Sequence, residues 1–168
     1  LVIPGGNYRF LSDKDASAGL KEWVKQGGKI VATDNAVAQM SGNDWGIKMK
    51  KSEDDKKDDK KNTYEDLRKF AESEHDGIRS FIAGAIYKID LDVTHPLAFG
   101  LGDTYYTLKQ DDNVYECFKE GWDGGGINKD NDVDSFVGSR IKEKIKDAVL
   151  IAEQEFGRGT LVYLADDP

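Results

Sequence analysis

Short apolar runs alternate with polar, glycine-containing segments at the start of the chain. The first apolar run covers residues 1–3, and a second one covers residues 29–32. Between them, residues 16–26 carry apolar side chains at helical spacing and precede the pair Gly27-Gly28, which is typical of a helix with a glycine C-cap. A strand, a helix and a second strand in this order predict a parallel unit with a right-handed crossover.

The middle of the chain loses this pattern. Residues 50–61 are lysines, aspartates, one serine and one glutamate, without an apolar side chain among them. Such a run cannot bury enough surface to offset the entropy lost on ordering, so we expect a charged, mobile insertion at about residues 50–63. Residues 64–74 are predicted to form a weak amphipathic helix that leads back into the domain.

The second half is richer in strand-forming residues. Strands are predicted at residues 85–91, 105–108, 113–118, 148–152 and 161–164, and a short helix at residues 139–146. Residues 156–159 have the glycine pattern of a hairpin-like turn before the last strand. Apolar runs alternate with helical segments over the chain, so we expect an α/β fold whose sheet is mainly parallel. Its expected strands are residues 1–3, 29–32, 148–152 and 161–164.

Length and charge narrow the possible functions. A chain of 168 residues is long enough for one domain with a real core, and we assign residues 1–168 to it. The net charge of −8 repels phosphate backbones and anionic lipids, so neither nucleic acid nor membrane insertion is expected. The apolar start inside an expected strand indicates a piece of a longer protein.

Asp34 is the first candidate for chemistry, because it lies between the predicted strand at residues 29–32 and a second helix that could start at residues 35–40. Amidotransferases hold a nucleophilic cysteine on such a turn, where the backbone exposes the side chain and offers N–H groups to the oxyanion. The small-residue pattern of that turn is missing around Asp34, so a loop or helix-capping role is the alternative. Cys117 lies in a predicted strand without flanking glycines and is expected to be a buried or half-buried structural residue.

The remaining candidates are a histidine and a group of aspartates. His95 precedes a proline in an expected extended turn, where a structural role competes with that of a catalytic base. Asp130, Asp132 and Asp134 occupy the first, third and fifth positions of a calcium loop. The positions where that loop needs glycine and glutamate hold serine and isoleucine, which leaves only an irregular cation site. Neither histidine has the His-x-x-Glu spacing of a zinc pair.

The order of several motifs resembles a known kind of domain. The motifs are Val2-Ile3-Pro4-Gly5-Gly6, Lys29-Ile30-Val31-Ala32, Ile82-Ala83-Gly84-Ala85-Ile86-Tyr87-Lys88, Thr94-His95-Pro96-Leu97-Ala98-Phe99-Gly100 and the run over residues 157–168. In this order they are similar to the class I glutamine amidotransferase-like domain that follows the catalytic domain in bacterial, Bacteroidetes-type zinc carboxypeptidases. The resemblance spans nearly the whole chain and implies a flavodoxin-like three-layer α/β fold.

The resemblance implies a parent protein but no catalytic residue in this chain. In that family a His-x-x-Glu pair, a distant histidine and a glutamate base lie in a separate upstream domain, and this sequence has no such set. Asp34 replaces the amidotransferase cysteine. We therefore expect a non-catalytic accessory domain without a cofactor of its own, the zinc belonging to the parent's catalytic domain. Its expected partner is the parent's own peptidase domain, in a periplasmic or secreted protein.

Two further functions stay open. A divergent hydrolase that uses Asp34 and His95 requires both side chains to converge in one cleft. A small-molecule or carbohydrate binding module requires a concave pocket with an exposed Trp45 or Trp122.

Overall fold

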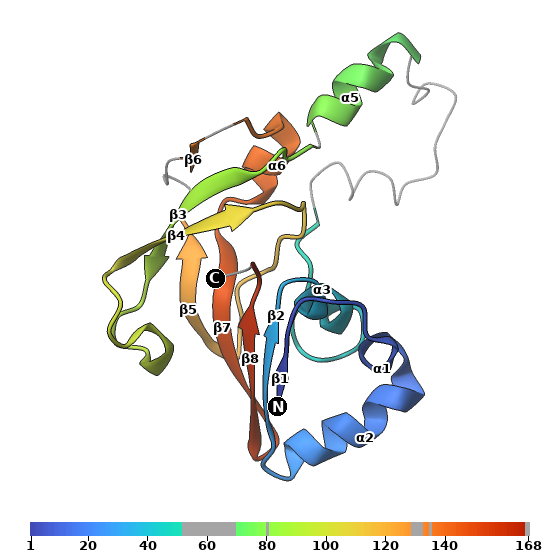
Figure 1. Cartoon of the computed structure of the whole chain (residues 1–168), viewed down its shortest axis with the longest axis vertical. Coiled ribbons are helices and arrows are strands. Elements are labelled where there is room, and N and C mark those ends of the chain that lie inside the picture. Colours follow the sequence, from blue (N-terminus) through green and yellow to red (C-terminus); the bar gives the residue numbers. More distant parts are fainter. Residues whose placement is uncertain (52–69, 80, 129–132, 135, 167–168) are drawn as a thin grey trace.

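A mixed β-sheet forms the centre of the molecule in the computed structural model, which describes residues 1–51, 70–79, 81–128, 133–134 and 136–166. The strands follow one another in the order β1-β2-β8-β7-β5-β3-β4, and β6 pairs with β3 (Figure 1). The strands are β1 (Val2–Ile3), β2 (Lys29–Thr33), β3 (Ala85–Leu91), β4 (Thr104–Lys109), β5 (Trp122–Ile127), β6 (Val133–Asp134), β7 (Ala148–Phe156) and β8 (Gly159–Leu164). The helices are α1 (Arg9–Ser12), α2 (Lys14–Lys25), α3 (Asn35–Ser41), α5 (Ser73–Arg79) and α6 (Ser139–Lys144), with short 3₁₀ turns η2 (Phe70–Glu72) and η3 (Pro96–Ala98).

Three neighbouring strands run parallel, as the first part of the sequence predicts. β2 pairs in parallel with β1 on one side and with β8 on the other. The chain passes from β1 to β2 through α1 and α2, and α2 occupies almost the range expected for a helix. Asp13 fixes the start of α2, because its Oδ1 accepts the N–H groups of Asp15 and Ala16. The predicted parallel unit of strand, helix and strand is confirmed for this segment.

The rest of the sheet is antiparallel, so the prediction of a flavodoxin-like three-layer fold with a mainly parallel sheet is wrong. β7 runs antiparallel to β8, and β5, β3 and β4 continue the antiparallel order. The reason lies in the turn between β7 and β8, where Phe156 pairs with Gly159 and Gly157 has a φ of +69°. A connection of two residues joins only antiparallel neighbours, because parallel strands need a crossover.

The interior strand β5, between β7 and β3, has no strand signal in the sequence. Its three glycines lower β propensity, yet the packing requires them. A Cβ on Gly125 would lie 2.7 Å from Leu91 Cδ2, and one on Gly126 would lie 2.8 Å from the Ala148 oxygen. Both neighbours approach closely where the β5–β7 register shifts, which is typical of a bulge. The strand predicted at residues 113–118 is wrong, because only isolated bridges at Tyr115 form there.

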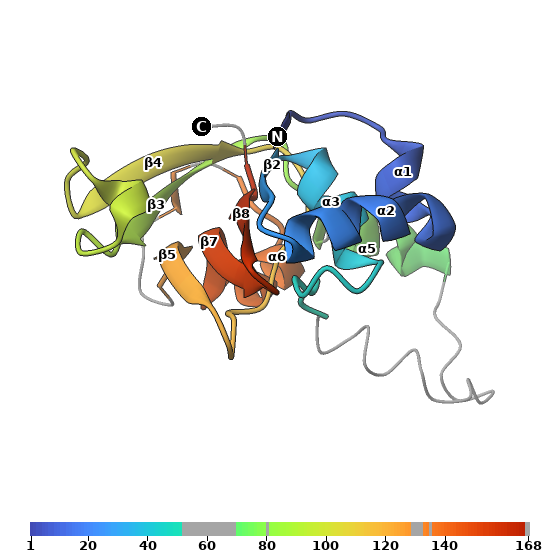
Figure 2. The same ribbon diagram turned by 90° about the horizontal axis from the view of Figure 1, so that it is seen from below.

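The sheet curls into a half-barrel, and Figure 2 shows β3 and β4 bending round beside β7 and β8. An ion pair closes the curl: Lys109 Nζ at the end of β4 lies 3.0 Å from Oδ1 of Asp166, just after β8. Strands β7, β5 and β3 lie between these two in the sheet. Curling thus brings together segments that no sequence pattern connects.

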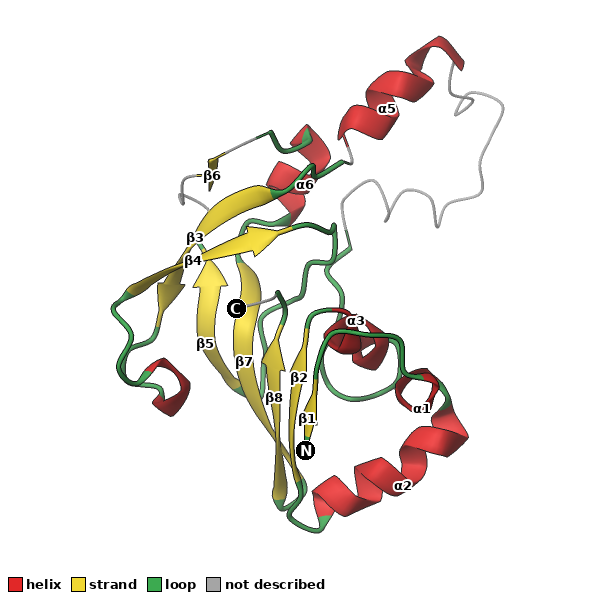
Figure 3. Ribbon diagram, viewed as in Figure 1, coloured by secondary structure: helices red, strands yellow, loops and turns green. Residues whose placement is uncertain are grey.

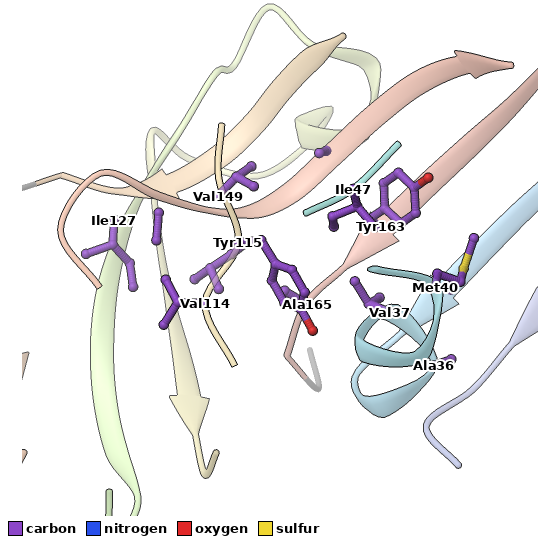
Figure 4. Packing of buried hydrophobic residues seen from close by; sticks show 14 of the residues in the cluster. Ala36, Val37, Met40, Ile47, Val114, Tyr115, Ile127, Val149, Tyr163 and Ala165 are labelled. Carbon is purple, nitrogen blue, oxygen red and sulfur yellow. The ribbon is translucent and has the colours of Figure 1, made fainter. Parts of the chain in front are cut away.

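Helices cover one face of the parallel strands. Figure 2 shows α1, α2 and α3 gathered beside β2, on the face where Ile30, Leu161 and Tyr163 are buried. Ala36, Val37 and Met40 of α3 belong to the same core as Tyr163 (Figure 4). On the opposite face Val31 and Val162 are only half-buried. The parallel part therefore has two layers, whereas the three-layer prediction needs helices on both faces.

The charged insertion expected at about residues 50–63 lies almost entirely outside the described residues. The predicted helix at residues 64–74 is described only from Phe70 onward, where η2 and α5 follow one another (Figure 3). Within the described ranges, no helix has the length and apolar character needed to cross a membrane.

Candidate ligand-binding site

Asp34 lies on a strained turn at the carboxyl end of β2. Its φ of 47° and ψ of −127° are unusual for a residue other than glycine and cost about 1–3 kcal/mol. The backbone N–H of Asp34 donates to the Leu164 oxygen at 2.9 Å, which links the ends of β2 and β8. A Cβ on Gly5 would lie 2.5 Å from Asp34 Oδ2, so the carboxylate faces the turn after β1. Asp34 precedes α3, but its side chain makes no cap hydrogen bond.

His95 is buried in the connection between β3 and β4. Its Nδ1 accepts the N–H of Leu97 at 3.2 Å and caps η3, and its Nε2 lies 3.8 Å from Glu153 Oε2 on β7. Among the contacts of the described residues, none joins His95 to Asp34. Both ring nitrogens of His95 already face partners. This favours a structural role for His95 in the turn over the role of a catalytic base that acts with Asp34.

The structure describes one of the three aspartates of the imperfect calcium loop. Asp130 and Asp132 lie outside the described residues, and Asp134 belongs to β6, where it pairs with Ile86 of β3. In the described part of the chain, no group of three or more histidine, cysteine, aspartate or glutamate side chains is arranged to hold a metal ion.

Cys117 is exposed and lies outside any strand, so its prediction as a buried or half-buried strand residue is wrong. The segment leaves the sheet after the bridge at Tyr115, which turns Cys117 toward solvent. Its Sγ donates to the Asp147 oxygen at 3.5 Å. Partial burial of the sulfur, with a smaller contribution from Asp123, raises the pKa of the thiol. A raised pKa disfavours the thiolate that nucleophilic chemistry needs.

The two tryptophans considered for binding have opposite environments. Trp45 is fully buried, and its carbonyl accepts the hydroxyl of Tyr163 at 2.6 Å. Trp122 begins β5 and is 66% exposed. Trp45 therefore belongs to the core, while Trp122 presents an indole face to solvent.

Trp122 lines a surface depression of about 370 Å³, together with Glu120, Gly121, Glu155 and Gly157. The sheet explains this grouping. Trp122 pairs with Glu153 across the β5–β7 ladder, and Glu155 is two residues further along β7 on the same face. The turn that joins β7 to β8 supplies Gly157. An exposed aromatic ring and two carboxylates thus meet in a concavity of the size that ligands occupy.

A second depression, of about 360 Å³, lies next to the first and shares Glu120 with it. Its lining includes Lys48, Lys119 and Cys117, and the aromatic ring in it is that of Phe118. Phe118 stacks on the buried Tyr163, with 5.6 Å between the ring centroids. Since that ring is already partly covered, it offers a ligand less apolar surface than Trp122 does.

A buried polar cluster lies at the other end of the sheet, where β4 meets β8. Lys109 is fully buried and contacts Asp111 at 2.8 Å and Asp166 at 3.0 Å. Burial raises the pKa of Asp166 despite the opposing charge of Lys109. The hydroxyls of Tyr87 and Tyr115 are buried without a hydrogen-bond partner in the described part of the chain. Burial, with a smaller contribution from Asp166, raises the pKa of Tyr87 to about 12. The cluster holds the curl of the sheet together.

Comparisons with known proteins add little. No protein-family model matches the sequence, and no curated protein shows significant similarity to it. Among solved structures, the crystal structure of a beta-galactosidase from Bacillus circulans sp. alkalophilus matches 98% of this chain at 13% identity and a TM-score of 0.48. The chain spans 18% of that galactosidase chain. A likeness this weak carries no argument about function.

The resemblance to class I glutamine amidotransferase-like domains of zinc carboxypeptidases is wrong. The sheet is mixed and curled instead of parallel, and no comparison connects the chain with amidotransferases or carboxypeptidases. Short motifs such as Val2-Ile3-Pro4-Gly5-Gly6 mark the ends of parallel strands in many folds. They therefore describe the β1-β2 unit without identifying a family.

Proposed function

We propose that this chain is a non-catalytic binding domain that holds a carbohydrate in the depression around Trp122. The observation that carries the proposal is the exposed indole of Trp122, set in a concavity beside Glu120 and Glu155. The proposal keeps the expectation of a domain without chemistry or a cofactor of its own. The proposed partner is a sugar instead of a peptidase domain, because the resemblance to zinc carboxypeptidases is wrong. The periplasmic or secreted location stays a prediction.

The chemistry of the depression fits a sugar ring. A pyranose has an apolar face of C–H groups that packs on an aromatic ring, and hydroxyls at its edge that donate hydrogen bonds. Trp122 offers the apolar surface, and it is a rigid platform because a tryptophan has few rotatable bonds. Glu120 and Glu155 offer carboxylate oxygens, which accept stronger hydrogen bonds than neutral groups do. One flat ring flanked by acceptors is what such a ligand requires.

The backbone around Trp122 keeps the ring accessible. Gly121 precedes it, and a Cβ there would lie 3.0 Å from the Glu153 oxygen and 3.1 Å from Phe118 Cβ, so the chain is tightly fitted at this turn. Trp122 itself is held in the β5–β7 ladder opposite Glu153. The platform is therefore fixed by the sheet while its side chain stays 66% exposed. A rigid site loses little entropy when it binds.

The contacts of Asp34 and His95 support a domain without catalysis. Each has its own partners, and a hydrolase using both would need them within reach of one substrate. The strain at Asp34 accompanies the join between β2, β8 and the turn after β1, which is a structural reason for its geometry.

A panel of immobilised oligosaccharides tests the proposal. The panel contains neutral, N-acetylated, amino and uronic acid sugars and is probed with the whole chain. We expect retention on at least one class, accompanied by a change in tryptophan fluorescence. The Trp122→Ala variant should lose both signals. Tyr106→Ala is the matched control, because Tyr106 is also an exposed aromatic residue of the same sheet, 63% exposed on β4. Equal loss of retention in the two variants would contradict a site at Trp122.

A further inference from the structure

We propose that the sugar held at Trp122 is positively charged, as an oligosaccharide of unacetylated amino sugars is. This inference rests on the proposed function and names the chemical class of its ligand. It starts from the charges around the depression. Glu120 and Glu155 line it, and its described lining contains neither lysine nor arginine.

A third carboxylate lies near the depression without lining it. Glu153 lies directly across the ladder from Trp122 and its side chain is 30% exposed, but its Oε2 lies 3.8 Å from Nε2 of His95. Two carboxylates, those of Glu120 and Glu155, therefore face the depression beside the indole ring. Like charges held close together repel one another, and a bound cation relieves that repulsion whereas a neutral hydroxyl does not.

An ammonium group matches both components of the site. It is attracted by the face of an indole ring, for which tryptophan is the best of the aromatic residues. It also donates charge-assisted hydrogen bonds to carboxylates. An N-acetyl group at the same position removes the charge, and a uronic acid reverses it. The site should therefore favour amino over N-acetylated sugars and repel acidic ones.

The binding of an acidic sugar, the alternative to an amino sugar, would require a cationic side chain such as Arg158. This residue follows Gly157 in the turn after β7 and is exposed, yet it is not among the lining residues of the depression. An acidic sugar would have to use this arginine or the lysines of the neighbouring depression, Lys48 and Lys119. Preference for a uronic acid oligomer is accordingly the outcome that points away from the carboxylates and toward these cations.

Isothermal titration of the whole chain with short glucosamine oligomers, and with the same oligomers after N-acetylation, tests the charge directly. At about pH 6 an amine with the pKa of an α-amino group, about 7.7–8.0, is protonated. We expect the glucosamine oligomer to bind about tenfold more tightly or better, since a hydrogen bond to a charged group is worth at least that factor. At about 0.5 M salt the difference should narrow, because exposed charges are screened.

Two variants separate the local charge from the overall charge. Glu155→Gln keeps the size and a hydrogen-bond acceptor but removes one carboxylate from the depression. It should lower the affinity for glucosamine oligomers about tenfold, and that for N-acetylated oligomers by a clearly smaller factor, because their hydroxyls keep an acceptor and no ammonium group is lost from the contact. Glu22→Gln makes the same change in net charge on the exposed side of α2 and should affect neither.

The outcomes distinguish this inference from the proposed function. Tighter binding of the N-acetylated or uronic acid oligomer, or an equal effect of Glu155→Gln and Glu22→Gln, would overturn the amino-sugar inference while leaving carbohydrate binding intact. Binding of no oligosaccharide in the wider panel would overturn both. Tenfold preference for the amine that depends on Glu155 and on salt supports the inference.

Discussion

Replacing Lys109 with methionine tests whether the ion pair at the end of β4 holds the curled sheet closed. Methionine keeps most of the length of the lysine stem and removes only the charged end. Lys109 is fully buried, and the side chain of Asp166 is only 8% exposed. Its second partner, Asp111, is 33% exposed and can be hydrated when the lysine is gone. The variant therefore leaves one buried carboxylate without a counter-charge.

Burial decides the size of the effect. An exposed ion pair contributes about 0–1 kcal/mol, whereas removing one partner of a buried pair costs about 3–5 kcal/mol. Since both charged ends here are almost out of solvent, we expect Lys109→Met to lower the free energy of unfolding by about 3–5 kcal/mol. The double variant Lys109→Met/Asp166→Asn should recover most of that loss, because it leaves no unpaired buried charge.

The loss should also depend on pH. Burial already raises the pKa of Asp166 in the wild type, with Lys109 opposing the shift. Without the lysine that pKa rises further. A carboxyl group whose pKa is raised in the folded state contributes stability below its unfolded pKa and loses that contribution as the pH rises through the folded value. The gap between wild type and Lys109→Met should therefore be smaller near pH 4 than at about pH 7.

Urea unfolding at both pH values, with the slope of the transition compared between variants, measures these quantities. A loss below about 1 kcal/mol at neutral pH would show that the pair behaves like a surface ion pair. A double variant no more stable than the single one would show that the buried carboxylate of Asp166 is not the cause.

Three other predictions follow from the packing. Gly159→Ala places a Cβ 2.1 Å from the backbone oxygen of Val24, so it should destabilise the fold by about 2–3 kcal/mol in urea unfolding. The control variant Gly19→Ala, in α2 with no atom within 4 Å of the added Cβ, should stabilise the fold by about 0.5–1 kcal/mol. A change of the same sign in the free energy of unfolding of both variants would contradict the close packing at Gly159. Tyr163→Phe removes the buried 2.6 Å hydrogen bond to the carbonyl of residue 45 and should cost about 1–3 kcal/mol by thermal unfolding, whereas an unchanged midpoint would deny that bond a role. Because its pKa is raised, Cys117 should react with iodoacetamide more slowly than free cysteine at neutral pH, and mass spectrometry showing a faster reaction would refute the raised pKa.

The local parts of the fold follow from local patterns. The spacing of apolar residues in the first helix and the apolar runs at β1, β2, β7 and β8 predict elements that the structure contains. The error lies in how they are combined. The turn at Gly157 carries the signal of a two-residue hairpin, and that signal already requires β7 to run antiparallel to β8. Alternation of strands and helices is the weaker indication, because it does not fix strand direction where a tight turn is present.

Local sequence patterns predict neither the curl of the sheet nor the interior strand β5. Gly124, Gly125 and Gly126 lower β propensity, and the reason for them is the close approach of Leu91 and Ala148 from distant segments. Lys109 shares the face of Tyr105 and Thr107 in β4, but a charged residue is expected at the surface. Only the meeting of β4 with the end of β8 explains its burial.

The candidate site is half visible in the sequence. Both Trp122 and Trp45 are candidate binding residues in the sequence. No sequence pattern distinguishes the buried tryptophan from the exposed one. Glu155 and Glu120 carry no signal of their own, since charged residues at the ends of strands are common. The β5–β7 register brings them beside Trp122.

The most direct test of the central claim compares the affinities of wild type, Trp122→Ala and Tyr106→Ala for the oligosaccharide that the panel retains best, measured by isothermal titration. We predict that Trp122→Ala weakens binding at least about tenfold, because truncating a tryptophan that anchors a binding site costs about 2 kcal/mol or more. Tyr106→Ala should bind like the wild type. An affinity of Trp122→Ala equal to that of the wild type would contradict a carbohydrate site at Trp122.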